Sequence, residues 1–144
     1  MNTFHHIVGN SLIGAVANMF VWFAVIFWMY LETGSVLATA YSGGIFMVAM
    51  ALSAFWFGSI VDHNKKKVVM LVSTTITLVA FSGAFVAYWL TPPEVFKEVT
   101  SPVLWFFVSC CLIALIASNL RNIAMPTLVT LLVPEGERDK ANGL

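Results

Sequence analysis

The side chains in this sequence that could do chemistry are mostly single charged or amide groups between long apolar stretches. Asp62 stands just before the basic run 65–67, and Arg121 lies far along the chain. A carboxylate and a guanidinium form strong, bidentate ion pairs that can hold two elements together. Asn18 could hydrogen bond to a ligand, and Glu32 could take up and release a proton. These residue types suit binding and switching rather than covalent catalysis.

The sequence gives little support for enzymatic chemistry. No HExxH, GxSxG or GxxxxGK[ST] pattern occurs, and no constellation of nucleophile and base is present. Cys110 and Cys111 are adjacent in an apolar run, and we interpret them as packing residues rather than a disulfide or metal site. The tandem His5-His6 has no third ligand nearby and suits the membrane interface. We therefore expect no enzyme activity, no cofactor and no metal.

The composition indicates a chain whose solvent is mostly lipid. Hydrophobic residues make up 60% and charged residues 10%, against about a quarter charged in soluble domains. The net charge is zero, and no basic patch suggests a nucleic-acid partner. Long charge-free runs reach the roughly 20 residues that a spanning helix needs, and backbone groups in lipid favour helices. The sequence thus predicts an all-α membrane protein, a transmembrane helix bundle with spans at about 7–31, 36–61, 68–91 and 103–124.

Aromatic and basic residues predict the orientation of these spans. Trp and Tyr residues next to the linkers 32–35 and 92–102 place both linkers at one membrane surface. The segments assigned to the opposite surface carry five loop Lys or Arg residues, against one in 92–102. Because basic loops stay in the cytoplasm, the 62–67 loop and the amino terminus are predicted to be cytoplasmic. We expect a multi-pass protein of the bacterial inner membrane.

The first run carries its polar residues on one side. Helical periodicity places Asn10, Asn18 and Glu32 within a sector about 100° wide. Polar residues inside spans commonly line substrate pathways, so Asn10 and Asn18 are candidates for substrate contact and Glu32 for proton coupling. Two alternatives stay open: an interhelical hydrogen bond of Asn18 without a ligand, and a solvated loop acid at position 32. The hydroxyls of the third run, 73–77, are expected to bond to their own helix.

The second run has a face of small residues that ends at Asp62. Small residues let the backbones of membrane helices approach closely, so this face predicts a close helix contact. A carboxylate at a helix carboxyl terminus opposes the local dipole. We therefore expect Asp62 to lie near another helix's amino terminus or an arginine, with an ordinary interfacial acid as the open alternative. The small residues are Ala40, Gly44, Ala51, Ala54 and Gly58.

The stretch "GSIVDHNKKK" at 58–67 resembles the cytoplasmic loop 2–3 signature of the major facilitator superfamily. That signature has a glycine, three residues, an aspartate, a basic position, any residue, a second glycine and two basic residues. His63 stands where Arg or Lys is usual, and Lys65 stands where the second glycine is usual. The matching positions are Gly58, Asp62, Lys66 and Lys67.

A second stretch, 125–144, looks like the helix 4–5 junction of drug- and siderophore-exporting members of that superfamily. The resemblance implies a secondary active transporter with twelve spans that works by alternating access. This chain would then supply the first four helices and the start of a fifth, with eight further helices as partners. Export of amphipathic small molecules by proton antiport, as in multidrug efflux, is implied as well. The matching residues are Leu132, Val133, Pro134, Ala141 and Asn142.

In the superfamily, the motif's aspartate helps to lock the cytoplasmic side by contacting the opposite half and a nearby arginine. Carried over to this chain, the resemblance implies a latch between Asp62 and Arg121. Gly58, Lys66 and Lys67 would complete this conformational-switch motif. The competing interpretation is a small four-helix membrane protein, complete as given, that acts as a channel, assembly factor or scaffold. Membrane lipid is a partner in both interpretations, and a small-molecule substrate in the first.

Overall fold

The computed structural model describes the backbone of residues 2–132 and the side chains of residues 8–124. This part of the chain is helical without strands, and four of its helices are long and apolar enough to cross a membrane. The predicted all-α transmembrane bundle is confirmed, and the spans begin and end close to the predicted positions. The helices are α1 (Asn2–Thr33), α2 (Val36–His63), α3 (Lys66–Leu90), α4 (Pro93–Lys97) and α5 (Pro102–Leu132).

A tight turn joins α1 to α2. Gly34 has a φ of 62°, a left-handed conformation that glycine adopts at little cost, and its N–H donates to the carbonyl oxygen of Tyr30 at 2.8 Å. The Ser35 hydroxyl then accepts a hydrogen bond from the N–H of Ala38 at 3.2 Å and caps α2. The hydrogen bonds at the end of α1 and at the start of α2 are thus both formed within this short turn. Because the turn is so short, α2 returns directly alongside α1.

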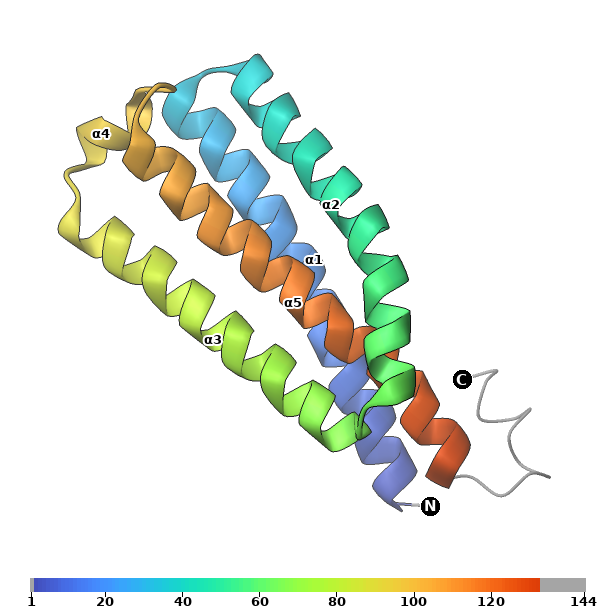
Figure 1. Cartoon of the computed structure of the whole chain (residues 1–144). Helices are drawn as coiled ribbons and strands as arrows, with labels where there is room; N and C mark the ends of the chain where they lie inside the picture. The colour runs from blue at the N-terminus through green and yellow to red at the C-terminus, as the bar shows by residue number, and fades with distance from the viewer. Residues whose placement is uncertain (1, 133–144) are drawn as a thin grey trace.

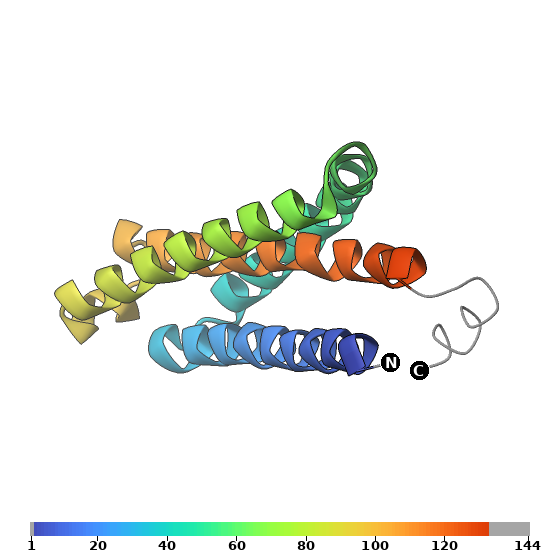
Figure 2. The same ribbon diagram turned by 90° about the horizontal axis from the view of Figure 1, so that it is seen from below.

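The central helix of the bundle is α5. It contacts α1, α2 and α3, whereas α1 and α3 have little direct contact with each other. Figure 2 shows α1 and α3 on either side of α5. Leu104, Ala114 and Leu115 of α5 are completely shielded, with 0% of their surface exposed. The three helices α1, α3 and α5 therefore form the frame in which a site can lie.

The two ends of the bundle agree with the predicted layout. Figure 1 shows the α1–α2 turn and α4 at one end, and the start of α1 and the α2–α3 turn at the other. The linkers predicted to share one surface are thus on the same side of the molecule. Which end faces the cytoplasm stays a prediction.

The most extensive helix contact joins α3 and α5. Ala84 is buried on α3, and a Cβ added to its neighbour Gly83 would lie 3.7 Å from Sγ of Cys110 on α5. Small residues therefore allow these two helices to approach closely. The buried Ser73 hydroxyl donates to the carbonyl oxygen of Ala117 at 2.6 Å, which ties α3 to α5.

The hydroxyls of α3 only partly follow the expectation drawn from the sequence. Thr74 donates to the carbonyl oxygen of Met70 at 2.8 Å, within its own helix, as expected. Thr77 has carbonyl oxygens within reach on both helices, at 2.9 Å on Ser73 and 3.3 Å on Ala114. The third-run hydroxyls thus also act across the helix interface, because α5 brings its backbone close to them.

The second predicted linker contains the short helix α4, which the sequence analysis did not foresee. Pro93 is its first residue, a position where the missing N–H has no helical partner to lose. Phe96 of α4 is 1% exposed. The centroid of its ring lies 5.6 Å from the ring centroid of Trp28, 5.6 Å from that of Tyr88 and 5.9 Å from that of Phe107. These four residues, termed the aromatic cluster, fasten α4 to the ends of α1, α3 and α5.

Candidate functional site

A small cavity with polar walls lies between α1, α3 and α5 and has a volume of about 200 Å³. It brings the polar sector of α1 together with one side of α5. Polar groups are costly inside a membrane, so several of them around one cavity mark a candidate functional site. We term it the polar cavity, and its polar lining residues are Asn10, Ser11, Asn18, Thr77, Ser118, Arg121 and Asn122.

Asn18 joins α1 to α5 inside this cavity. Oγ of Ser118 lies 2.7 Å from Oδ1 of Asn18 and 2.8 Å from the carbonyl oxygen of Leu115, and its single proton serves one of these acceptors at a time. The interhelical hydrogen bond considered from the sequence is therefore present. This bond uses the amide oxygen of Asn18 and leaves its amide N–H groups for another acceptor.

Arg121 supplies the positive charge of the polar cavity. It is half-buried on α5, one turn beyond Ser118. Among the residues that the structure describes, none that is acidic lines the cavity and none forms an ion pair with Arg121. A guanidinium stays charged at every physiological pH. The cavity therefore presents a cation with no ion-pair partner among the described residues, in the last turn of the apolar span Pro102–Ala124.

Asp62 lies outside the polar cavity. Its side chain is exposed in the last turn of α2, whereas Val61 beside it is buried with Val69 and Leu120. No ion pair joins Asp62 to Arg121 in this structure. The latch implied by the resemblance is therefore not formed in this arrangement, and a double-mutant cycle on transport would test whether the two residues are coupled.

The rest of the resembling motif closes the end of α2 with side chains. Carbonyl groups at the end of a helix lack partners within it. Lys65 has a φ of −61°, which any residue accepts, so the turn needs no glycine at the position where the superfamily usually has one. Three side chains bond to α2 carbonyl oxygens: His63 to Ser59 at 2.9 Å, Asn64 to Ile60 at 2.9 Å, and Lys66 to Val61.

A second cavity adjoins the polar cavity at Val21, which lines both. Its volume is about 380 Å³ and its walls are apolar, with Trp28, Phe85, Tyr88 and Phe107 supplying the rings. It opens to the surface of the described bundle, since Phe85 is 62% and Tyr88 49% exposed. We term it the aromatic cavity. Sequence reasoning missed it because aromatic residues at span ends also suit the bilayer interface. The one available signal was that they recur at the same end of three spans.

Glu32, the candidate for proton coupling, lies at the far end of α1. It is half-buried and lines neither cavity. Its neighbour Thr33 donates to the carbonyl oxygen of Met29 at 2.7 Å, which places Glu32 at the α1–α2 turn. The structure thus brings together Asn10, Asn18 and Arg121 but not Glu32, whose role in coupling stays a prediction.

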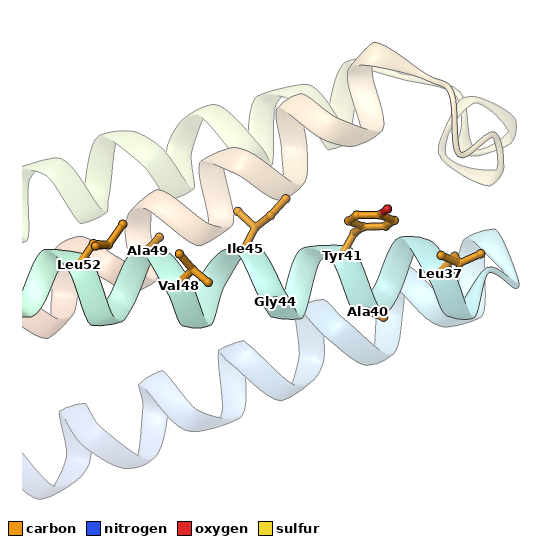
Figure 3. A pocket seen from close by; sticks show the side chains of 8 residues that line it. All are labelled: Leu37, Ala40, Tyr41, Gly44, Ile45, Val48, Ala49 and Leu52. Carbon is orange, nitrogen blue, oxygen red and sulfur yellow. The ribbon is translucent and has the colours of Figure 1, made fainter.

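The small-residue face of α2 has no helix against it in the described part of the chain. A Cβ added at Gly44 or Gly58 would meet no atom within 4 Å. Figure 3 shows eight side chains, from Leu37 to Leu52, that all belong to α2. They line a hollow with a volume of about 640 Å³. Walls from one helix cannot enclose a ligand, so this hollow is not the candidate site. The exposed small residues are Ala40, Gly44, Ala51 and Ala54.

Some predicted features fall outside the described side chains. These are the tandem His5-His6 and residues 133–144, which include the matched positions Val133, Pro134, Ala141 and Asn142. Among the described residues, no group of three or more His, Cys, Asp or Glu could hold a metal ion. Cys110 and Cys111 are free thiols on α5.

Comparisons with protein-family models, with curated proteins and with solved structures each found no match for this chain. The function must therefore be inferred from the structure. The chain forms a multi-pass membrane protein in which a polar and an aromatic cavity adjoin between three of its four long helices.

Proposed function

We propose that this membrane protein is a secondary active transporter of the major facilitator type, which exports amphipathic small molecules by alternating access in exchange for protons. The observation that carries the proposal is the polar cavity inside the bundle, next to the aromatic cavity. Transporters bind substrates near the bilayer midplane, among polar groups from several helices. Together the two cavities reach the range of about 300–1,000 Å³ typical of small-molecule sites.

The residues take separate roles in this proposal. Asn10 and Asn18 belong to the substrate pathway, and Glu32 carries the coupling proton. The motif of Gly58, Asp62, Lys66 and Lys67 forms the conformational switch at the cytoplasmic surface of a bacterial inner membrane. The bond from Lys66 to the end of α2 supports this role, because it makes the α2–α3 turn a firm connection between two moving helices. Eight further helices complete the transporter.

Energised dye export tests the proposed function. Bacterial cells that express the complete protein are expected to accumulate several-fold less N-phenyl-1-naphthylamine, an uncharged amphipathic dye, than cells without it. A protonophore should abolish the difference. Asn18→Leu, which removes the amide from the polar cavity, should reduce export, whereas Met19→Leu should not, because Met19 is 72% exposed and lines neither cavity. Equal dye accumulation with and without the protein, at normal membrane levels, would contradict the proposal.

A second candidate function rests on the uncovered face of α2. Small residues on a membrane helix favour helix association, and this face has no partner among the described residues. A channel, assembly factor or scaffold would use it to bind other membrane helices. Absence of dye export together with stable self-association or co-purification through α2 would favour this candidate.

A further inference from the structure

We propose that the two adjoining cavities form one binding site for an amphipathic organic anion. Its carboxylate or sulfonate would bind at Arg121, and its aromatic body would occupy the aromatic cavity. This inference names the substrate class of the transporter, and so it rests on the proposed function.

The charge of the site is the first argument. Arg121 is half-buried beside the polar cavity, and no Asp or Glu among residues 8–124 lines either cavity. A cation inside a membrane bundle is costly unless an opposite charge or a hydrogen-bond acceptor compensates it. An arginine binds carboxylates and sulfonates through two parallel hydrogen bonds. An anionic ligand would therefore supply what the described lining lacks.

The hydrogen-bonding groups around Arg121 point to the same chemistry. The hydroxyl protons of Ser118 and Thr77 have protein acceptors within reach. Asn18 keeps both of its amide N–H donors for a ligand, while its amide oxygen lies 2.7 Å from Oγ of Ser118. The side chain of Arg121 has only donors, and the amide N–H groups of Asn18 and Asn122 add further donors for a group that accepts hydrogen bonds. The polar cavity thus favours an anion over an organic cation.

The shape of the site favours an elongated amphipathic ligand. The two cavities share the wall residue Val21 and are therefore neighbours along the groove between α1 and α3. Along α5, Arg121 and Phe107 are separated by about 21 Å at 1.5 Å per residue, so a ligand that reaches both residues must extend along the bundle. The ring faces of Trp28 and Phe107 lie in the second cavity, with centroids 4.7 Å apart. Volumes of about 200 and 380 Å³ suit a molecule with up to three rings rather than a two-chain phospholipid.

A matched pair of probes tests this inference. The anion 8-anilinonaphthalene-1-sulfonate and the uncharged N-phenyl-1-naphthylamine share one ring system and differ in the sulfonate. Both are titrated against the complete protein in phosphatidylcholine nanodiscs. Arg121→Gln should weaken binding of the sulfonate about tenfold or more and leave binding of the uncharged probe within about twofold. Arg121→Lys should retain most of the sulfonate affinity, and Phe85→Ala, on the aromatic cavity, should weaken both probes.

Several results would overturn the inference. They are an unchanged sulfonate affinity in Arg121→Gln, an equal loss for both probes, or no sulfonate binding to the unmodified protein. Loss of sulfonate binding when phosphatidylglycerol replaces phosphatidylcholine would identify a lipid anion as the occupant instead. Export of the uncharged dye separates the two proposals. If the uncharged dye is exported while the sulfonate neither binds nor is exported, the anion site is wrong but the transporter proposal is supported. If neither probe is exported, the transporter proposal is wrong.

Discussion

Replacing Phe96 by alanine is expected to lower the free energy of unfolding by about 3–5 kcal/mol, the usual cost of deleting a buried phenyl ring. Phe96 is 1% exposed and contacts the rings of Trp28, Tyr88 and Phe107. It is the one buried residue of α4, a helix too short to be stable by itself. Its loss should therefore detach α4 from the bundle and leave a cavity under it.

The measurement is reversible unfolding of the purified protein in mixed micelles, by titration with a denaturing detergent. Phe106→Ala serves as the matched control, because Phe106 is 55% exposed on the outer surface of α5. We expect the control to change the unfolding free energy by less than about 1 kcal/mol. Similar small losses for both variants would mean that α4 does not anchor the end of the bundle.

Arg121→Gln is expected to reduce transport about tenfold or more, because a charge-assisted hydrogen bond contributes about 1.5–3 kcal/mol. Asp62→Asn should reduce transport several-fold without loss of protein, since a carboxylate at the end of α2 opposes the helix dipole and does not stabilise that helix. The structure leaves Asp62 exposed and places Arg121 on the polar cavity, with no ion pair between them. We therefore expect the two losses to be independent, so that the double variant shows their product.

A double-mutant cycle on the transport rate decides this point. Independent losses would assign Asp62 to the conformational switch and Arg121 to the substrate pathway. A double variant no worse than Arg121→Gln alone would instead show that the two residues act as a pair. That result would restore the latch implied by the superfamily motif, in a conformation other than this one.

Much of the fold could be predicted from the sequence because lipid imposes simple constraints. Charge-free runs determine the spans, and the basic and aromatic residues between them determine which linkers share a surface. Helical periodicity also placed Asn10 and Asn18 on the same side of α1, and both line the polar cavity. This part of the site could be predicted because the spacing of residues within one helix determines which of them share a side.

The other features of the site depend on which helices pack against each other. The sequence of a single span does not determine these helix contacts. Arg121 and Ser118 face Asn18 because α5 packs between α1 and α3, a contact set by small residues on two helices. The Ser73 bond to α5 has the same origin. The helix α4 was missed because prolines were interpreted as helix breakers, whereas Pro93 begins the helix. The aromatic cavity was missed because Trp28 and Tyr88 also suit an interface.

The most direct test of the account is the accessibility of position 18 from each side of the membrane. Single cysteines at Asn18, His63, Glu94 and Met19 are introduced into the complete protein without Cys110 and Cys111. They are then treated with a membrane-impermeant thiol reagent from one side at a time. His63→Cys should react only from the cytoplasm and Glu94→Cys only from outside, while the exposed, lipid-facing Met19→Cys should not react from either side. Alternating access through the polar cavity predicts that Asn18→Cys reacts from both sides. Reaction from one side alone, or from neither, would contradict it.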